Sequence, residues 1–404
     1  MKRRFVIIGM SDSSVPQFPD EAIEAISKSK VFSGGIRHRS IVGEILPFGY
    51  EWIDIKPPLD DVFRQFDQAF SGGTQTIVVF ASGDPLFFGF ANTVMRKLPD
   101  AEIHLFPYFN SLQTLAHRSL TRYDDMLMVS LTGRPWREFD NALIRRTKKI
   151  GVLTDREHTP SAIAQRMIDY GYADYEMVVG ERLGNVEHEK VSRLTLEEAS
   201  RTTFDNPNCL IVNQLSTSNL QLSTNFGLAD NQFELLNGRT KMITKAPIRL
   251  LSLQAMELPK RTAMWDVGFC TGSVSIEARL MFPHLKITAF EIRPECERLM
   301  HINSRRFGAP GIESVMGDFM DIDLSSYPAP DAVFIGGHGG RLKEMMTKIK
   351  DVLSPGGCIV FNSVTAESRE IFEQTAKELC LELKPPMRIA LNDFNPITIM
   401  KCSL

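Results

Sequence analysis

Short apolar runs alternate with amphipathic helical patterns along most of the chain. In the first half these runs predict strands over residues 5–8, 76–81, 102–106, 126–130, 149–153, 175–179 and 209–212. Helices are predicted between them, for example over 20–28 and 161–170, where the preceding Thr-Pro is typical of a helix start. Strands and helices that alternate in this way predict a layered α/β architecture.

The pattern breaks at residues 214–232. This segment is poor in charge, rich in Ser, Thr and Asn, and without strong periodicity, which predicts a linker between domains. Beyond it we expect a helix over 247–256, strands over 263–267, 286–292, 312–316, 332–335 and 357–362, and an antiparallel strand pair within 388–402. These elements predict a mostly parallel sheet with helices on both faces.

Composition narrows the class of protein. A chain of 404 residues is too long for one ordinary core, and 43% apolar with 24% charged residues is typical of a soluble protein. The net charge of −3 does not favour nucleic acid as a partner. No run approaches the roughly 18 apolar residues of a membrane span, and the N-terminal run over 5–8 is too short for a signal peptide. Six cysteines without a CxxC pair indicate reduced, buried thiols in a cytoplasmic protein and no metal site.

The second half carries the most informative ligand signature. An apolar strand over 263–267 runs into a Gly-rich turn and then a helix, and the next strand ends in the acid Glu291. Class I methyltransferases and dinucleotide dehydrogenases share this order. Cys270 stands where a second glycine is common, which weighs against the close approach of a pyrophosphate and favours S-adenosylmethionine over NAD. The candidate cofactor contacts in the turn are Gly268, Phe269, Cys270, Thr271 and Gly272, and Glu291 would accept hydrogen bonds from ribose hydroxyls.

Two later motifs extend this candidate site. Asp318 and Phe319 follow the third strand, where the acid would accept a hydrogen bond from an adenine amino group and the ring would pack nearby; an ordinary strand-end turn is the alternative. His338 lies among four glycines after the fourth strand and is a candidate for proton transfer near neutral pH, or an exposed loop residue.

The first half carries a second signature, Gly83-Asp84-Pro85, after the strand over 76–81. Alone it is a common turn. In order with Pro107-Tyr-Phe-Asn-Ser111-Leu-Gln, Ser130-Leu-Thr-Gly-Arg134, the segment 153–164 and Val179-Gly-Glu-Arg-Leu-Gly184, it resembles the tetrapyrrole (corrin/porphyrin) methylase family. Joined to the second half, nearly the whole chain resembles the fused precorrin-6Y C5,15-methyltransferase (decarboxylating) family of cobalamin biosynthesis.

The resemblance implies a fold, a cofactor and a substrate. It implies a tetrapyrrole methylase domain at 1–213, in lobes of about 1–108 and 109–213, and a class I methyltransferase domain at 233–404. Each would bind S-adenosylmethionine and act on a precorrin or cobalt-precorrin, at C5 in the first half and at C15 with decarboxylation in the second. The implied cofactor contacts outside the Gly-rich turn are Gly83, Asp84, Pro85, Ser111, Thr159, Pro160, Thr244, Glu291, Asp318 and Phe319. Asp84 and His338 are the candidate catalytic residues, Asp84 as a loop-shaping or substrate-facing acid and not as a base. We also expect a homo-oligomer.

Departures from the family pattern keep alternatives open. The first turn, Gly9-Met-Ser-Asp-Ser-Ser14, lacks the expected Gly-x-Gly-Pro-Gly, Thr132 replaces a His, and Asn110 replaces a Ser. One alternative is a class I methyltransferase that acts on RNA or protein. Another is a corrinoid- or nucleotide-binding module with degenerate catalytic sites, and a third is an NAD-dependent dehydrogenase.

Overall fold

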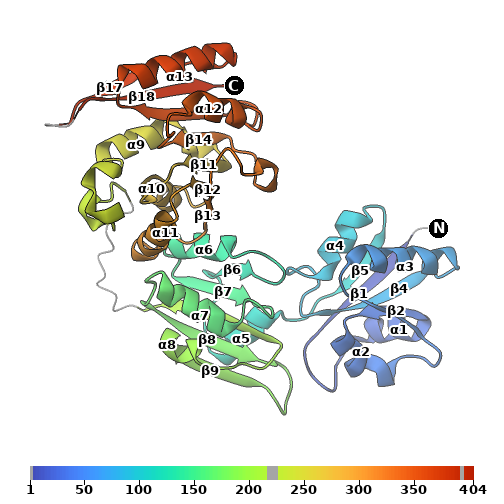
Figure 1. The fold of residues 1–404 in the computed structure, drawn as a ribbon. Coiled ribbons are helices and arrows are strands. Elements are labelled where there is room, and N and C mark those ends of the chain that lie inside the picture. Colours follow the sequence, from blue (N-terminus) through green and yellow to red (C-terminus); the bar gives the residue numbers. More distant parts are fainter. Residues whose placement is uncertain (1–2, 216–225, 392–394) are drawn as a thin grey trace. The chain divides into compact units, whose positions relative to one another are not determined.

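A computed structural model describes residues 3–215, 226–391 and 395–404. Contacts divide the chain into two compact units: unit 1 holds Met1–Arg134, Lys148–Gln165 and Asp174–Leu215, and unit 2 holds Pro135–Thr147, Arg166–Ala173 and Ser216–Leu404. The architecture is α/β throughout, as the sequence predicts (Figure 1).

The first sheet of unit 1 is wholly parallel, with the order β3-β2-β4-β1-β5. Alternate residues of β1 pack on opposite faces: Phe5 and Ile7 lie in a cluster with residues of α3 and α4, and Val6 and Ile8 in a cluster with residues of α1 and α2. Burial on both faces explains why β1 and β4 are continuous apolar runs. The elements are β1 (Arg4–Met10), α1 (Asp20–Lys28), β2 (Val31–Gly34), α2 (Ile36–Val42), η1 (Gly43–Ile45), β3 (Glu51–Asp54), α3 (Leu59–Ser71), β4 (Thr76–Ser82), α4 (Phe90–Lys97) and β5 (Glu102–Phe106).

The second sheet has the order β6-β7-β10-β8-β9, and only the β6–β7 pair is parallel. Helix α5 begins after Asn110, whose side chain accepts a hydrogen bond from the Gln113 amide at 2.8 Å while the Gln113 side chain accepts from the Asn110 amide at 3.0 Å. This reciprocal cap explains the helix start. The elements are α5 (Ser111–Arg118), β6 (Leu127–Ser130), α6 (Arg137–Ile144), β7 (Lys149–Leu153), α7 (Pro160–Asp169), β8 (Tyr175–Glu181), β9 (Lys190–Thr195), α8 (Leu196–Ser200) and β10 (Asn208–Gln214).

The sheet of unit 2 has the order β13-β12-β11-β14-β15-β18-β16, and β17 also pairs with β18. The strand order reverses at β11, which pairs in parallel with β12 on one side and β14 on the other. Strand β18 is antiparallel to its neighbours, which confirms the predicted antiparallel pair. One sheet face packs against α12 and α13, and the other against α9 and α10 (Figure 1).

The elements of this sheet unit are η2 (Asp230–Gln232), η3 (Leu236–Gly238), η4 (Thr240–Met242), α9 (Ala246–Ala255), η5 (Leu258–Lys260), β11 (Ala263–Val267), α10 (Ser273–Met281), β12 (Lys286–Glu291), α11 (Glu295–Arg306), β13 (Ile312–Met316), η6 (Leu324–Ser326), β14 (Ala332–Ile335), α12 (Leu342–Lys350), β15 (Cys358–Ser363), α13 (Ala366–Glu378), β16 (Glu382–Leu383), β17 (Met387–Ile389) and β18 (Ile397–Ser403).

The predicted linker lies partly outside the described residues. Gln214 ends β10, and residues 216–225 are not described. After them, the amides of Gly227 and Leu228 both donate hydrogen bonds to Glu277, and the Leu228 side chain is buried. Residues 226–232 therefore pack within unit 2, and the domain limits of 1–213 and 233–404 stay a prediction.

Two further findings bear on function. Five of the six cysteines are buried, whereas Cys380 is exposed, which corrects the expectation that all six are buried. Within 3–215, 226–391 and 395–404, no helix is long and apolar enough to cross a membrane, and no cluster of His, Cys, Asp and Glu has a metal-binding arrangement.

Candidate active sites

Unit 2 contains a cavity of about 580 Å³ at the carboxyl ends of β11 and β14. This is the point where the strand order reverses, the usual place for a ligand in an open α/β sheet. Of the predicted contacts, five line the cavity: Thr244, Gly268, Phe269, Cys270 and Thr271. The Gly-rich turn is therefore placed at a cavity, as its sequence predicts.

The turn requires glycine at its first position. Gly268 has φ +80°, and a Cβ atom there would lie 2.7 Å from the backbone nitrogen of Gly337. Cys270 also adopts a positive φ of 49°, which L-residues rarely occupy. Its amide donates a hydrogen bond of 2.9 Å to the carboxylate of Glu291, which joins the turn to the end of β12.

Glu291 is buried behind this turn and does not line the cavity. Its Oε1 atom accepts hydrogen bonds from the amides of Ile292 and Arg293 and from the Arg293 guanidinium at 2.9 Å. Arg293, unlike Glu291, lines the cavity. Burial acts to lower the pKa of its guanidinium, but the hydrogen bond with Glu291 outweighs burial, so the pKa lies above the ordinary arginine value. In this structure the carboxylate predicted to bind a ribose is therefore already paired.

Asp266 is a cavity residue that the sequence interpretation did not single out. It lies within β11 among apolar residues, is fully buried, and accepts a hydrogen bond of 2.6 Å from the Ser275 hydroxyl at Oδ2. Its Oδ1 atom has no hydrogen-bond partner among the described residues. Burial raises the pKa of this carboxyl to about 7, and the charge of Glu291 acts in the same direction. An acid inside an otherwise apolar strand is the signal that could have identified it.

The remaining predicted residues of this half lie outside the cavity wall. Gly272 precedes α10. Asp318 accepts a hydrogen bond from the Met320 amide at 2.9 Å and pairs with Arg341 at 3.1 Å. Phe319 is buried in the core, 5.2 Å from Phe290 between ring centroids, so its ring is packed there and does not line the cavity.

His338 lies on the loop after β14 and is half-buried. Its Nδ1 atom accepts a hydrogen bond of 3.2 Å from the Gly340 amide, and its ring contacts the Phe361 ring at a centroid distance of 5.6 Å. Burial lowers the pKa of this imidazole below 6.5. Because a backbone amide can only donate, Nδ1 is unprotonated and the ring hydrogen lies on Nε2.

Unit 1 contains a second cavity, of about 500 Å³, at the carboxyl ends of β1, β2 and β4. Gly83 and Ser111 line it, as predicted. Gly83 has φ +62°, and a Cβ atom there would lie 2.8 Å from Cα of Asn110. The wall also includes Asp12, Arg37, His38 and Ser82, none of which the sequence interpretation selected.

Four predicted residues of this half shape loops beside the cavity instead of lining it. Asp84 accepts a hydrogen bond of 2.8 Å from the Leu86 amide, which closes a turn, and Pro85 is buried within that turn. Thr159 accepts one of 3.2 Å from the Ala162 amide ahead of the first residue of α7, Pro160. These contacts favour the loop-shaping interpretation of Asp84.

Comparison with known proteins assigns both halves. A model of the tetrapyrrole (corrin/porphyrin) methylases matches residues 6–200, and a model described as a precorrin methyltransferase domain matches 237–402. A precorrin-6Y C(5,15)-methyltransferase [decarboxylating] from Sinorhizobium sp. is 29% identical over 371 residues, which cover 90% of this chain and 86% of the relative. A cobalt-precorrin-6B C(15)-methyltransferase (decarboxylating) from Salmonella typhimurium is 38% identical over 133 residues, which cover 33% of this chain and 68% of the relative. The chain belongs to the decarboxylating precorrin methyltransferases, and over 90% of its length it is similar to a precorrin-6Y C(5,15)-methyltransferase.

Membership of this family identifies the chain as a methyltransferase and S-adenosylmethionine as its cofactor. A third relative, the precorrin-6Y C(5,15)-methyltransferase [decarboxylating] of Mycobacterium tuberculosis (strain ATCC 25618 / H37Rv), is 25% identical over 383 residues, which cover 94% of this chain and 92% of the relative. This assignment argues against two of the alternatives that the sequence left open, an NAD-dependent dehydrogenase and a methyltransferase that acts on RNA or protein.

Proposed function

We propose that the protein uses S-adenosylmethionine to methylate a precorrin at C5 and C15 and to remove carbon dioxide from its ring-C acetate, in cobalamin biosynthesis. One observation carries the proposal. Among the cavities of the described residues, two lie at the carboxyl ends of parallel strands, and each of these lies in a segment that matches a different methyltransferase family model. Two donor sites suit an enzyme that adds two methyl groups.

In unit 2 we assign the cofactor to the cavity beside Gly268. The residues fit it, because the unpartnered Oδ1 of Asp266 can accept a hydrogen bond from the α-ammonium group, and the turn after β11 leaves room for the ligand. Thr244, Phe269, Cys270 and Thr271 would contact it there. Glu291 would position the turn through the Cys270 amide, and Asp318 and Phe319 would support the adjoining loop.

S-Adenosylmethionine supplies an electrophilic methyl group, whose carbon–sulfur bond breaks as the sulfur keeps the electron pair. The chain's own contribution is to align an electron-rich meso carbon with that group, and such alignment lowers a barrier by roughly 7–11 kcal/mol. Decarboxylation breaks the bond between the acetate carbon and its carboxylate, and the electron pair passes into the conjugated macrocycle. The carbon then needs a proton, for which His338 is our candidate donor.

In unit 1 we assign methylation at C5 to the cavity lined by Gly83 and Ser111. Asp84, Pro85, Thr159 and Pro160 would hold the loops around the donor. The departing thioether is neutral and needs no acid, and we assign Asp84 no proton transfer, because its carboxylate closes the turn at Leu86.

The test is incubation of the full chain with a precorrin substrate and the donor, followed by mass spectrometry. We expect a gain of two methyl groups and loss of one carboxyl group. A product with neither change, from a protein that binds the donor, would contradict the proposal and favour a binding module with degenerate sites. That the protein is cytoplasmic and a homo-oligomer stays a prediction. Light scattering on the purified protein would test the oligomeric state.

A further inference from the structure

The mouth of the unit 1 cavity carries a hydroxyl group whose hydrogen has no acceptor among the described residues. The Ser82 oxygen accepts a hydrogen bond of 2.7 Å from Arg37 and lies 3.0 Å from Nε2 of His38. The Gly35 amide donates to Nδ1 of His38 at 3.1 Å, so Nδ1 is unprotonated and Nε2 carries the ring hydrogen. Ser82 therefore accepts from both neighbours, and its own hydrogen is left to donate to a ligand.

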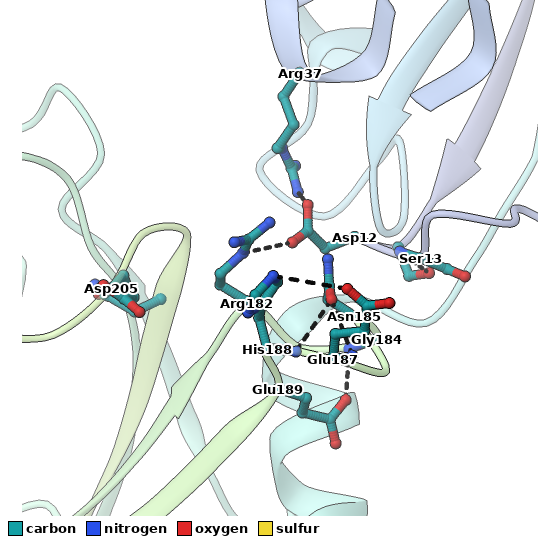
Figure 2. A network of polar contacts seen from close by, with 12 residues as sticks. Asp12, Ser13, Arg37, Arg182, Gly184, Asn185, Glu187, His188, Glu189 and Asp205 are labelled. Carbon is teal, nitrogen blue, oxygen red and sulfur yellow. Dashed lines mark hydrogen bonds and ion pairs between the residues drawn. The ribbon is translucent and has the colours of Figure 1, made fainter. Parts of the chain in front are cut away.

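Two guanidinium groups meet one carboxylate beside this hydroxyl. Asp12, 4% exposed, accepts a hydrogen bond of 2.6 Å from Arg37 at one oxygen and of 3.2 Å from Arg182 at the other (Figure 2). The side chains of Arg37 and Arg182 are about one-third exposed. The cluster thus has one positive charge in excess, and both oxygens of its acid are already engaged.

The wall of this cavity also includes aromatic residues. Phe87, Phe88 and Phe109 line it, and Phe88 and Phe109 are also exposed. The Arg134 guanidinium lies 5.0 Å from the Phe88 ring centroid. A cavity wall that combines aromatic rings with hydrogen-bond donors suits a flat ring system that carries acidic side chains.

We propose that Ser82, Arg37 and Arg182 bind a peripheral carboxylate of the tetrapyrrole and so set which position of the macrocycle faces the donor in unit 1. This inference rests on the proposed function and names specificity-determining residues within it. Asp12, the acid of the cluster, is held by both guanidinium groups, so Ser82 and the two arginines are the members that present donors to a ligand. They suit a bare carboxylate better than the amino-acid end of S-adenosylmethionine, whose ammonium group would need an acceptor beside its carboxylate.

The experiment uses the full chain with Ser82→Ala and Arg37→Gln, and with Arg39→Gln as the matched control. Arg39 is on the same helix, is exposed, and does not line the cavity. A donor with an isotope-labelled methyl group lets NMR distinguish C5 from C15 methylation. Loss of a hydrogen bond to a charged group predicts about a tenfold or greater rise in KM for the tetrapyrrole at C5 in both test variants. Methylation at C15, decarboxylation and affinity for S-adenosylhomocysteine should not change, and Arg39→Gln should behave as the wild type.

Each other outcome has a distinct meaning. Weaker S-adenosylhomocysteine binding with an unchanged KM for the tetrapyrrole would assign the cluster to the donor and overturn the proposal. If neither the KM for the tetrapyrrole nor the affinity for S-adenosylhomocysteine changed, the cluster would have only a structural role in its loop, and the proposal would also be overturned. If Arg37→Gln fails to fold, the Ser82→Ala variant alone tests the proposal. The Ser82 side chain is exposed, so its removal leaves no cavity in the core. If the wild type itself does not methylate C5, the proposed function fails, and tetrapyrrole binding followed by absorbance, wild type against Ser82→Ala, still decides this inference.

Discussion

At the scale of single residues, the buried acid Asp266 predicts how stability depends on pH. Its buried carboxyl has a pKa of about 7 against an ordinary 3.8. Between these values the unfolded chain has lost the proton and the folded chain keeps it, so stability falls as pH rises from about 4 to 7 and is then constant. We expect Asp266→Asn to remove this pH dependence, which thermal unfolding across that range would detect.

The same substitution should weaken the donor site of unit 2. Exchange of the carboxylate for an amide removes a charged acceptor for the cofactor's ammonium, with an expected loss of about tenfold or more in S-adenosylhomocysteine affinity. Calorimetry measures this loss, and Asp351→Asn, an exposed acid at the end of α12, is the control. Unchanged affinity would leave Asp266 with a structural role alone.

His338 offers a second test at this scale. If it protonates the carbon left by decarboxylation, the reaction depends on the protonated ring and slows as pH rises through a pKa that burial places below 6.5. His338→Ala should then lower decarboxylation by about a hundredfold, the lower part of the range for general acid catalysis, and abolish that pH dependence with donor affinity preserved. His301→Ala, exposed on α11, is the control. Unchanged turnover would make His338 an ordinary loop residue.

At the scale of elements, the ranges of several strands were predicted correctly from the sequence. The bounds of β5, β7, β11, β13 and β14 agree with the apolar runs residue for residue. The prediction missed β2, β3, β9 and β16. Strand β2 ends in Ser-Gly, β16 has two residues, and β3 and β9 are edge strands with exposed positions, so none of the four is a continuous apolar run.

The candidate sites were less predictable than the strands, for a physical reason. The Gly-rich turn and Gly83 sit in local motifs, so sequence spacing finds them. Arg37, Ser82 and Arg182 come from three separate segments of the chain, and only the tertiary fold brings the two arginines to the Asp12 carboxylate and Ser82 to Arg37. The spacing of these residues along the chain does not indicate that they lie together in the fold.

The N-terminal cap of α5 leads to a prediction about the stability of that helix. Asn110→Ala removes the side-chain acceptor for the Gln113 amide, at an expected cost of about 1 kcal/mol to the helix start. Hydrogen exchange at the first-turn amides of α5 should accelerate about fivefold. Asn110→Ser, the residue of the family pattern, keeps a capping oxygen and should exchange as the wild type; equal acceleration in both variants would argue against the cap.

At the scale of the whole molecule, the two halves should lose their donor sites independently. A Cβ atom at Gly268 meets Gly337, and one at Gly83 meets Asn110, and both positions also require a positive φ. Gly268→Ala should therefore abolish C15 methylation and decarboxylation but keep C5 methylation, and Gly83→Ala should do the reverse. The control Gly43→Ala meets only the Tyr50 hydroxyl at 3.9 Å.

The decisive measurement is calorimetry with S-adenosylhomocysteine. The wild type should bind two equivalents, each single variant one, and the double variant none, because the cavities lie in separate sheets with no strand in common. If either single substitution removed both equivalents, the sites would be coupled through the chain. If the wild type bound one equivalent and Gly83→Ala left it unchanged, unit 1 would not hold a donor, and the addition of two methyl groups would need another explanation.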